Sequence, residues 1–319
     1  MEISPTIHFA HSAYQFTDCF ALRASGHTHF QTWTSDETAA RIAEAQVLVI
    51  TGFWQNEWLE KATNLRYIHV CGAGYDRFDV AAIEARGLRL CNSSGVNVNA
   101  VSDHAMALLL TLSRQIHLAR DRQAKAEWRD MIGVIAERED ELAGKTMLIY
   151  GLGAIGGRLG RLAQAFGMRV IGIRRSEGPP PDGIDAVYAP AAFHDQLAEA
   201  DVAVLTCPLT EETRGLVDEA AFECMKPSAF LINVARGPVV DEDALVKALS
   251  NGLIAGAGLD VFEPEPLPES SPLWNLENAV ITPHTGGETR LYEENVLDFL
   301  VENLGRLARG ERELINQIV

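Results

Sequence analysis

One stretch near the middle of the chain constrains the fold more than any other. It begins with a short apolar run, 146–150, rich in branched and aromatic side chains. Three glycines follow in the order G-x-G-x-x-G: Gly151, Gly153 and Gly156. Apolar residues then recur at helical spacing over 155–166, and a second apolar run occupies 169–173. The pattern predicts a strand, a tight glycine turn, a helix and a second strand, which together form one βαβ unit.

Each glycine has a physical reason in this setting. The first permits the turn, the second lets the backbone approach a pyrophosphate, and the third lets the helix pack closely against the strand. The N-terminus of the helix adds unpaired N–H groups and a partial positive charge, which favour phosphates. Such a glycine pattern also occurs in flexible loops. Here the strand and helix stand where phosphate binding needs them, so the stretch predicts a dinucleotide-binding site.

The residues after the second strand indicate which dinucleotide binds. Enzymes that use NAD usually place Asp or Glu there, whereas this chain has Arg174, Arg175 and Ser176. A guanidinium cannot accept a hydrogen bond from a ribose hydroxyl, but it can bind a 2′-phosphate. We therefore predict NADP(H) as the preferred cofactor, with NAD(H) as a second option. The alternative is that both arginines are solvated turn residues and that the cofactor specificity is mixed.

Composition narrows the range of partners. A chain of 319 residues suggests about two domains. Its net charge of −17 argues against nucleic acid or an anionic membrane as a partner, because both attract positive surfaces. The five cysteines form no C-x-x-C pair and no metal-type cluster, which predicts reduced thiols, no metal site and a cytoplasmic location. We expect no signal peptide and no membrane-spanning helix.

The region before the glycine turn also alternates strands with helices, which is typical of an α/β domain. A long helix is predicted from about Asn99 to about Ala126. Phe53 and Trp54 follow an apolar strand at 47–50, where open α/β sheets keep their ligands. They could line a substrate pocket or belong to the core. The glycine-rich loop at 71–76 could point N–H groups at an anion or could be an ordinary tight turn.

Polar residues follow several predicted strands in the second half of the chain. The carboxyl ends of strands in a doubly wound sheet share one edge, so four of these residues should converge near the cofactor: Thr206, Arg236, Asp260 and His284. Hydride transfer to a carbonyl requires a proton at its oxygen, and the imidazole of His284 suits that role near neutral pH. Glu265 would favour the protonated imidazole, and Arg236 could bind a substrate carboxylate. Each of the three could instead be an ordinary loop residue.

The chain resembles the D-isomer-specific 2-hydroxyacid dehydrogenases. The resemblance rests on six stretches in order: 71–76 (CGAGYD), 92–97 (NSSGVN), 151–156 (GLGAIG), 233–241 (NVARGPVVD), 259–267 (LDVFEPEPL) and 282–287 (TPHTGG). It implies an NAD(P)-dependent oxidoreductase acting on a CH–OH group. Arg174 stands where the family usually has an acidic residue. This departure is similar to the NADP-preferring hydroxypyruvate/glyoxylate reductase and haloarchaeal D-2-hydroxyacid dehydrogenase branches.

The resemblance implies further roles. The substrate arginine would be Arg236, the acid–base His284 and its partner Glu265, and backbone N–H groups around Ala73 and Gly74 would hold the substrate carboxylate. Asp260 would bind the nicotinamide carboxamide. Other expected cofactor contacts are Ala154, Ile155, Thr206, Cys207, Pro208, Val234, Ala235 and Gly286. A homodimer is also a family expectation.

We therefore predict an α/β fold with two Rossmann-like domains and an active site in the cleft between them. Residues 1–102 plus 285–319 would form a flavodoxin-like substrate domain, and 103–284 an NAD(P)-binding Rossmann domain. The predicted reaction is reversible reduction of a small 2-oxoacid to a D-2-hydroxyacid. The alternatives are a nucleotide-sensing corepressor on the same fold without turnover, and a formate- or phosphite-type dehydrogenase.

Overall fold

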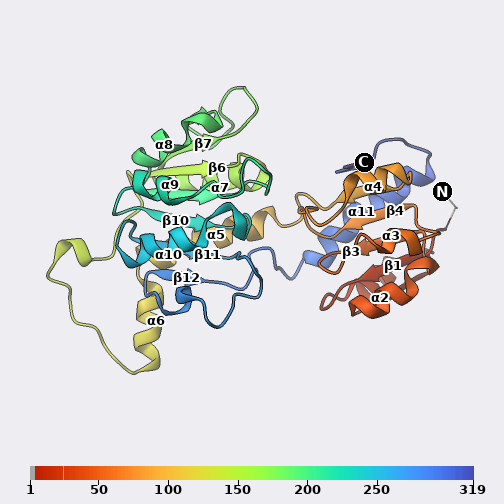
Figure 1. Cartoon of the computed structure of the whole chain (residues 1–319), viewed down its shortest axis with the longest axis horizontal. Helices are drawn as coiled ribbons and strands as arrows, with labels where there is room; N and C mark the ends of the chain where they lie inside the picture. Colours follow the sequence, from red (N-terminus) through yellow and green to blue (C-terminus); the bar gives the residue numbers. More distant parts are fainter. Residues whose placement is uncertain (1–3, 24) are drawn as a thin grey trace. The chain divides into compact units, whose positions relative to one another are not determined.

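The computed structural model describes residues 4–23 and 25–319. Contacts divide the chain into two compact units. Unit 1 consists of the chain up to Asn97 together with Glu288–Val319, and unit 2 is Val98–Gly287. The borders predicted from the sequence follow residues 102 and 284. The borders in the structure follow residues 97 and 287. Figure 1 shows a sheet flanked by helices in each unit.

Unit 1 is built on a five-stranded parallel sheet in the order β2-β1-β3-β4-β5. Its strands are β1 (Ile7–Ala10), β2 (His29–Thr32), β3 (Val47–Ile50), β4 (Tyr67–Val70) and β5 (Arg89–Asn92). Its helices are α1 (Phe16–Ala21), α2 (Ser35–Arg41), η1 (Ile42–Glu44), α3 (Trp58–Lys61), α4 (Val80–Ala85) and α11 (Tyr292–Ala308). The strand order 2-1-3-4-5 is that of flavodoxin-like folds, so this prediction is confirmed.

Unit 2 is built on a seven-stranded parallel sheet in the order β12-β11-β10-β9-β6-β7-β8. Its strands are β6 (Thr146–Tyr150), β7 (Arg169–Ile173), β8 (Ala186–Tyr188), β9 (Val202–Leu205), β10 (Phe230–Asn233), β11 (Gly256–Leu259) and β12 (Ala279–Ile281). Its helices are α5 (Val98–Ser113), α6 (Ile116–Ala124), η2 (Ile135–Glu137), α7 (Ala154–Ala165), η3 (Pro190–Ala192), α8 (Phe193–Glu199), α9 (Glu219–Cys224), η4 (Gly237–Val239), α10 (Glu242–Ser250) and η5 (Pro272–Asn275). This is the Rossmann arrangement, so the predicted fold class is confirmed for both units.

Most of the strands form because their residues are nearly all apolar, and β2 (HFQT) and β5 (RLCN) are more polar exceptions. Both faces of a parallel sheet are covered by helices, so its strands need no polar face. In unit 2 one core cluster packs between the sheet and α8, α9 and α10, and the other packs between the sheet and α5 and α7. Two further clusters cover the two faces of the sheet in unit 1. Both sheets are therefore rigid platforms for the loops at their carboxyl edges.

The prediction of one long helix from Asn99 to Ala126 is wrong. The helix ends at Ser113, and a second helix starts at Ile116 after Gln115 adopts a left-handed backbone conformation with φ of 49°. The apolar face that packs on α7 and the sheet stops near Leu112. No side chain of α6 is buried, so no core packing holds it on the line of α5.

Candidate active site

The candidate residues of unit 2 follow consecutive strands of one parallel sheet. In the order of the sheet, strands β12, β11, β10, β9, β6 and β7 are followed by His284, Asp260, Arg236, Thr206, Gly151 and Arg174. Because all neighbouring strands are parallel, these positions lie along the same edge. The strand order reverses between β6 and β9, which is where sheets of this kind bind their ligands.

The glycine turn has the geometry that a dinucleotide needs. Gly151 has φ of +109°, and a Cβ there would lie 2.7 Å from the backbone nitrogen of Cys207. A Cβ on Gly156 would lie 2.3 Å from the carbonyl oxygen of Gly151. A Cβ on Gly153 would instead meet no described atom within 4 Å. The first and third glycines are therefore required by packing, while the second leaves open space beside the backbone.

Helix α7 begins directly after this open position. Gly153 is its N-cap, and the first turn, which includes Ala154 and Ile155, holds no acidic residue. The Oγ1 of Thr206 donates a hydrogen bond of 2.7 Å to the carbonyl oxygen of Gly151, which ties the end of β9 to the turn. The turn and the helix N-terminus thus fit the pyrophosphate of a dinucleotide.

His284 and Glu265 are in direct contact. The Nδ1 of His284 lies 2.8 Å from Oε2 of Glu265, and the other carboxylate oxygen accepts a 3.0 Å hydrogen bond from the N–H of Phe262. A carboxylate can only accept, so Nδ1 of His284 carries a proton. The imidazole is 46% exposed, so its free edge is accessible.

The carboxyl group of Glu265 is held in its charged form. Burial raises its pKa, but the hydrogen bonds from His284 and from the N–H of Phe262, with the nearby charge of Arg236, outweigh burial. The pKa of Glu265 therefore lies below its usual value. A charged carboxylate beside Nδ1 stabilises the protonated imidazole, which is the form that can donate a proton.

Asp260 organises the loop that carries His284. This carboxylate is 3% exposed, and one oxygen accepts from the Oγ1 of Thr282 at 2.6 Å and the N–H of Thr285 at 3.0 Å. The other oxygen accepts from the N–H of Gly286 at 2.9 Å. Between these anchors His284 adopts a left-handed conformation with φ of 55°. A non-glycine residue takes this conformation only where its surroundings impose it.

Sequence reasoning missed His104 as part of this arrangement. Its Nε2 lies 2.8 Å from the Oγ1 of Thr282 and 3.3 Å from Oδ1 of Asp260. Because the hydroxyl of Thr282 donates to Asp260, it accepts from His104. Burial raises the pKa of Asp260, and the hydrogen bonds from His104, Thr282 and Gly286 bring it below its usual value. The only signal in the sequence was a histidine near the start of an apolar helix.

Close backbone packing places Arg236. The turn after β10 is fixed by Asn233, which is 1% exposed and bonds both the N–H of Ala235 and the carbonyl oxygen of Arg236, each at 3.0 Å. A Cβ on Gly237 would lie 2.1 Å from the carbonyl carbon of Phe262. Only glycine permits this approach, which brings the arginine beside the loop of Glu265. Asn233 was also missed, although a polar residue at the end of an apolar strand is a visible signal.

The arginines after β7 differ in their surroundings. The Nη2 of Arg174 donates a 2.9 Å hydrogen bond to the carbonyl oxygen of Pro179, so this side chain lies along its own loop. Its Nε is buried and has no partner among the described residues. Arg175 and Ser176 are exposed. No acidic side chain stands directly after β7.

The side chains of three other expected cofactor contacts are buried, so these residues present mainly backbone atoms to a ligand. Cys207, Val234 and Ala235 are 5%, 9% and 4% exposed. Burial raises the pKa of Cys207 to about 12, so its thiol is not a nucleophile at neutral pH. The carbonyl oxygen of Pro208 accepts a 2.7 Å hydrogen bond from Thr213.

The loop of unit 1 at 71–74 presents backbone rather than side chains. The carbonyl oxygen of Ala73 accepts a 2.6 Å hydrogen bond from Nδ2 of Asn92, and that of Gly72 accepts one of 3.0 Å from the N–H of Ser93. Within the described chain, the N–H groups of residues 72–74 donate no hydrogen bond. They therefore remain available to an anion.

The prediction for Trp54 needs correction. Its side chain is 5% exposed, stacks on Phe78 with ring centroids 5.2 Å apart, and bonds Asn56. Trp54 therefore belongs to the core of unit 1, which was the alternative left open by the sequence. It offers little surface to a substrate, whereas Phe53 is only partly buried.

Among the described residues, no three or more His, Cys, Asp or Glu side chains are grouped so that they could hold a metal ion. None of the described helices is long and apolar enough to cross a membrane.

Comparison with known proteins identifies the family. The model of the D-isomer specific 2-hydroxyacid dehydrogenase NAD binding domain matches residues 106–286. The glyoxylate reductase of Thermococcus litoralis is 39% identical over 275 residues, which cover 85% of this chain and 82% of that protein. The chain belongs to the D-isomer-specific 2-hydroxyacid dehydrogenase family. It is therefore an oxidoreductase that acts on CH–OH groups with a nicotinamide cofactor.

Other members of the family agree with this. The glyoxylate/hydroxypyruvate reductase B of an Enterobacter species is 40% identical over 257 residues, covering 80% of this 2-hydroxyacid dehydrogenase and 78% of that protein. The structure of D-lactate dehydrogenase from Aquifex aeolicus, complexed with NAD and lactic acid, matches with a TM-score of 0.84 and 27% identity. That match covers 98% of this chain and 99% of the other.

Proposed function

We propose that this dehydrogenase reduces a small 2-oxoacid of the glyoxylate or hydroxypyruvate class, with NADP(H) as its preferred cofactor. The observation that carries the proposal is the contact of 2.8 Å between His284 and Glu265 at the edge that also holds the glycine turn. The named activities of two relatives, glyoxylate reductase and glyoxylate/hydroxypyruvate reductase B, support the substrate class.

The proposed role of His284 is to move a proton at the substrate oxygen. Glu265 would accept the hydrogen bond from Nδ1, which leaves Nε2 as the atom that donates a proton as the ketone becomes an alcohol. Asp260 and its bonds to Thr282, Thr285 and Gly286 keep the ring in one orientation. The bound nicotinamide would supply the hydride. In the reverse direction His284 would accept the proton.

The substrate carboxylate would be bound by two kinds of donor. Arg236 offers a planar guanidinium, which can form two parallel hydrogen bonds to a carboxylate. The backbone N–H groups of Ala73 and Gly74 offer donors that need no side chain. Either kind of donor would favour a substrate with a carboxylate over a ketone without one.

The proposed preference for NADP(H) is supported by the charge after β7. An exposed Arg175, Arg174 beside it and the absence of a carboxylate there favour a 2′-phosphate over a free ribose hydroxyl. The glycine turn at 151–156 and the first turn of α7 would hold the pyrophosphate. One charge-assisted bond would provide roughly tenfold to hundredfold discrimination.

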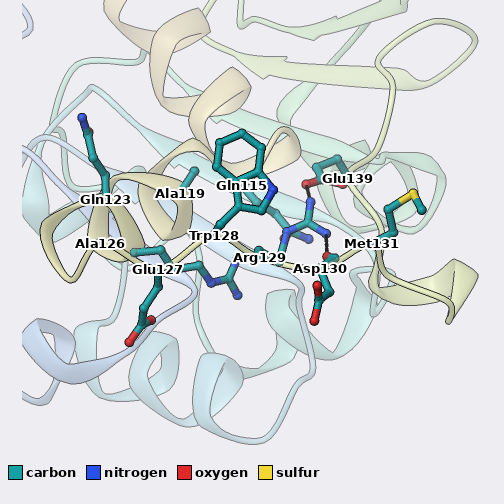
Figure 2. A pocket seen from close by; sticks show the side chains of 11 residues that line it. Gln115, Ala119, Gln123, Ala126, Glu127, Trp128, Arg129, Asp130, Met131 and Glu139 are labelled. Atoms are coloured by element: carbon teal, nitrogen blue, oxygen red, sulfur yellow. Dashed lines mark hydrogen bonds and ion pairs between the residues drawn. The ribbon is translucent and has the colours of Figure 1, made fainter.

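A homodimer is also part of the proposal. The segment that follows α6 carries large apolar side chains in water: Trp128 is 97% exposed, Met131 98%, Ile135 79% and Val134 55%. Figure 1 shows this segment extending away from the sheet of unit 2, and in Figure 2 its Arg129 reaches Glu139. An exposed apolar group of this kind is typical of a contact surface. A cytoplasmic location stays a prediction from the cysteine pattern.

The decisive experiment follows NADPH and NADH consumption with glyoxylate, hydroxypyruvate, pyruvate and larger 2-oxoacids. We expect turnover with at least one small 2-oxoacid and a kcat/KM for NADPH at least roughly tenfold above that for NADH. Arg174→Asp and Arg175→Ala should each reduce this ratio. Cofactor binding without turnover of any 2-oxoacid would overturn the proposed activity. Equal or better use of NADH by the unmodified enzyme would overturn the cofactor preference alone.

The dimer can be tested separately. Sedimentation equilibrium of the full chain should give twice the monomer mass, and Trp128→Glu with Met131→Glu should give the monomer. Trp274→Glu is a matched control, because this side chain is 51% exposed on η5 of the same unit. A monomeric wild-type protein would contradict the dimer and leave the proposed reaction untouched.

A further inference from the structure

Four polar side chains are buried together in unit 1. Tyr67, His69, Ser93 and Asn303 are each 0% exposed, and they come from β4, the end of β5 and α11. Burial of a polar group is costly unless all its hydrogen bonds are made. The bonds among these side chains therefore show what the cluster does.

The bonds form one chain with a single direction. The hydroxyl of Ser93 donates to the carbonyl oxygen of Val70 at 2.9 Å, so its oxygen accepts from Nε2 of His69 at 2.8 Å. A neutral imidazole then has its lone pair on Nδ1, which accepts from the hydroxyl of Tyr67 at 2.6 Å. The oxygen of Tyr67 accepts in turn from Nδ2 of Asn303 at 3.1 Å.

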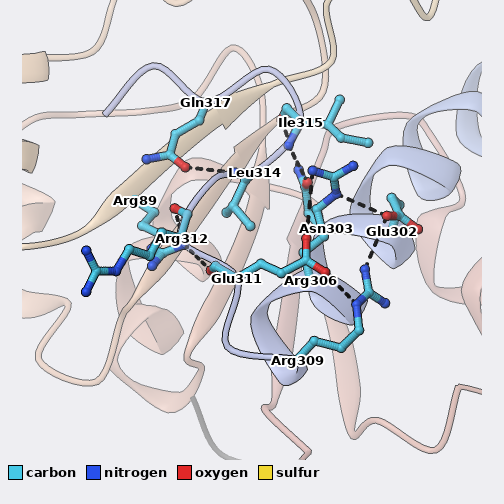
Figure 3. A network of polar contacts seen from close by, with 10 residues as sticks. All are labelled: Arg89, Glu302, Asn303, Arg306, Arg309, Glu311, Arg312, Leu314, Ile315 and Gln317. Atoms are coloured by element: carbon cyan, nitrogen blue, oxygen red, sulfur yellow. Dashed lines mark hydrogen bonds and ion pairs between the residues drawn. The ribbon is translucent and has the colours of Figure 1, made fainter.

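The far end of the chain is fixed as well. Asn303 exchanges two hydrogen bonds with the backbone of Ile315, which donates to Oδ1 at 2.7 Å and accepts from Nδ2 at 3.1 Å. Figure 3 shows this contact, where ion pairs of α11 join the same C-terminal segment. The orientation of the Asn303 amide is therefore determined. Burial lowers the pKa of His69 to about 3, in agreement with a neutral ring that has one proton.

The near end of the chain reaches the loop that we propose for the substrate carboxylate. Four successive carbonyl oxygens of this loop, at residues 70–73, accept hydrogen bonds from Ser93 Oγ, Tyr292 Oη, Ser93 N and Asn92 Nδ2 respectively. Each peptide group is planar and trans, so fixing the carbonyl of Gly72 also fixes the N–H of Ala73 in the opposite direction. Fixing the carbonyl of Ala73 does the same for Gly74.

We propose that Tyr67, His69 and Asn303 are positioning residues that act through Ser93 to aim the N–H groups of Ala73 and Gly74 at the substrate carboxylate. This inference rests on the proposed role of those N–H groups in 2-oxoacid binding. None of the four buried side chains touches the substrate. Their effect is to hold the peptide groups in the binding orientation before the substrate arrives, which lowers the cost of binding.

The test uses Tyr67→Phe and Ser93→Ala, which each remove one hydroxyl and keep the shape of the core. KM for glyoxylate, or for whichever small 2-oxoacid the enzyme turns over, should rise roughly fivefold to tenfold. We expect kcat and the NADPH dissociation constant to stay within about twofold. Thr32→Val is the matched control, because Thr32 takes part in another buried network of the same sheet, where it lies 2.7 Å from Nε2 of His8. It should reduce the melting temperature without changing KM.

A second measurement does not depend on activity. Hydrogen exchange of the peptide segment 70–76 should be at least roughly tenfold faster in Tyr67→Phe than in Thr32→Val. If exchange and KM were unchanged in both Tyr67→Phe and Ser93→Ala, the proposed positioning role of the hydrogen-bond chain would be wrong. The proposed reductase activity would not be affected. Faster exchange in a protein that reduces no 2-oxoacid would support the hydrogen-bond chain as a support of the loop. The proposed reductase function would then be wrong.

Discussion

The pair that we propose for proton transfer, His284 and Glu265 of unit 2, and the loop that we propose for the substrate carboxylate, 71–74 of unit 1, use different chemical groups. At His284 the working groups are side chains, and the backbone around them is held by Asp260. At 71–74 the available groups are backbone N–H donors, and neighbouring side chains hold their carbonyls. A change of His284 itself should therefore reduce activity. A change of a side chain within 71–74 should have little effect, whereas a change of the neighbouring side chains that hold its carbonyls should weaken substrate binding.

Replacing His284 should have the largest effect. Its loss removes general acid–base help, so His284→Ala should reduce kcat by about 10²–10⁴-fold. His194→Ala is a suitable control, since His194 is exposed on α8 of the same unit. Steady-state kinetics with the preferred 2-oxoacid will measure both. A loss below tenfold would show that the proton comes from another group.

Glu265→Gln should have the next largest effect. The amide can still contact Nδ1 but provides no negative charge, so the protonated imidazole is less favoured. We expect kcat for reduction to fall roughly tenfold to hundredfold at neutral pH. The basic limb of its pH profile should move to lower pH. An unchanged profile would separate Glu265 from proton transfer.

Asp260→Asn tests whether side-chain support matters equally at the first site. The carboxylate of Asp260 now accepts hydrogen bonds from two backbone N–H groups. The nitrogen of an asparagine amide cannot accept such a bond, so the loop of His284 should loosen. We expect kcat/KM to fall about tenfold and the melting temperature to drop. A variant with lower thermal stability but unchanged kcat/KM would limit Asp260 to the fold.

The buried network beneath the loop predicts a pH dependence of stability. Burial lowers the pKa of His69 from 6.5 to about 3. Below pH 6.5 the unfolded chain binds a proton that the folded chain does not, so stability is lost as pH falls toward 3. This slope is at most about 1.4 kcal/mol per pH unit. His69→Gln should reduce the slope between pH 6.5 and 5, as measured by urea unfolding. The slope that remains comes from His8 and His11, whose pKa values burial lowers to about 4. Equal slopes in both proteins would contradict the neutral buried ring.

Ala73→Ser should have the smallest effect. The side chain of Ala73 is exposed, and the proposed donor is its backbone N–H. KM for the 2-oxoacid should therefore stay within about threefold. A larger rise would mean that the methyl group itself lines the site, and the contrast between the two regions would weaken.

The sequence showed the parts whose chemistry lies in side chains with recognisable spacing. The glycine turn, both sheet types and the contact of Glu265 with His284 followed from apolar runs and the polar residues after them. The break at Gln115 did not, because it depends on where the apolar face of α5 loses its neighbours. His104 and the chain through His69 were missed because they depend on partners far away in the sequence, such as Thr282, Ser93 and Asn303. Asn233 bonds only residues 235 and 236, so its role was missed although its signal was local. Trp54 was assigned to a substrate pocket but is buried in the core of unit 1. Its position after a strand is compatible with either place, so the sequence could not distinguish them.

The linear order of the sheet edge makes the enzyme modular. Five strand spacings of about 4.8 Å separate the end of β7 from the end of β12, or roughly 24 Å. That is more than twice the distance over which exposed charges act on one another in physiological salt. Evolution or engineering can therefore exchange the charge at Arg174 and leave the proton transfer that we propose for His284 undisturbed.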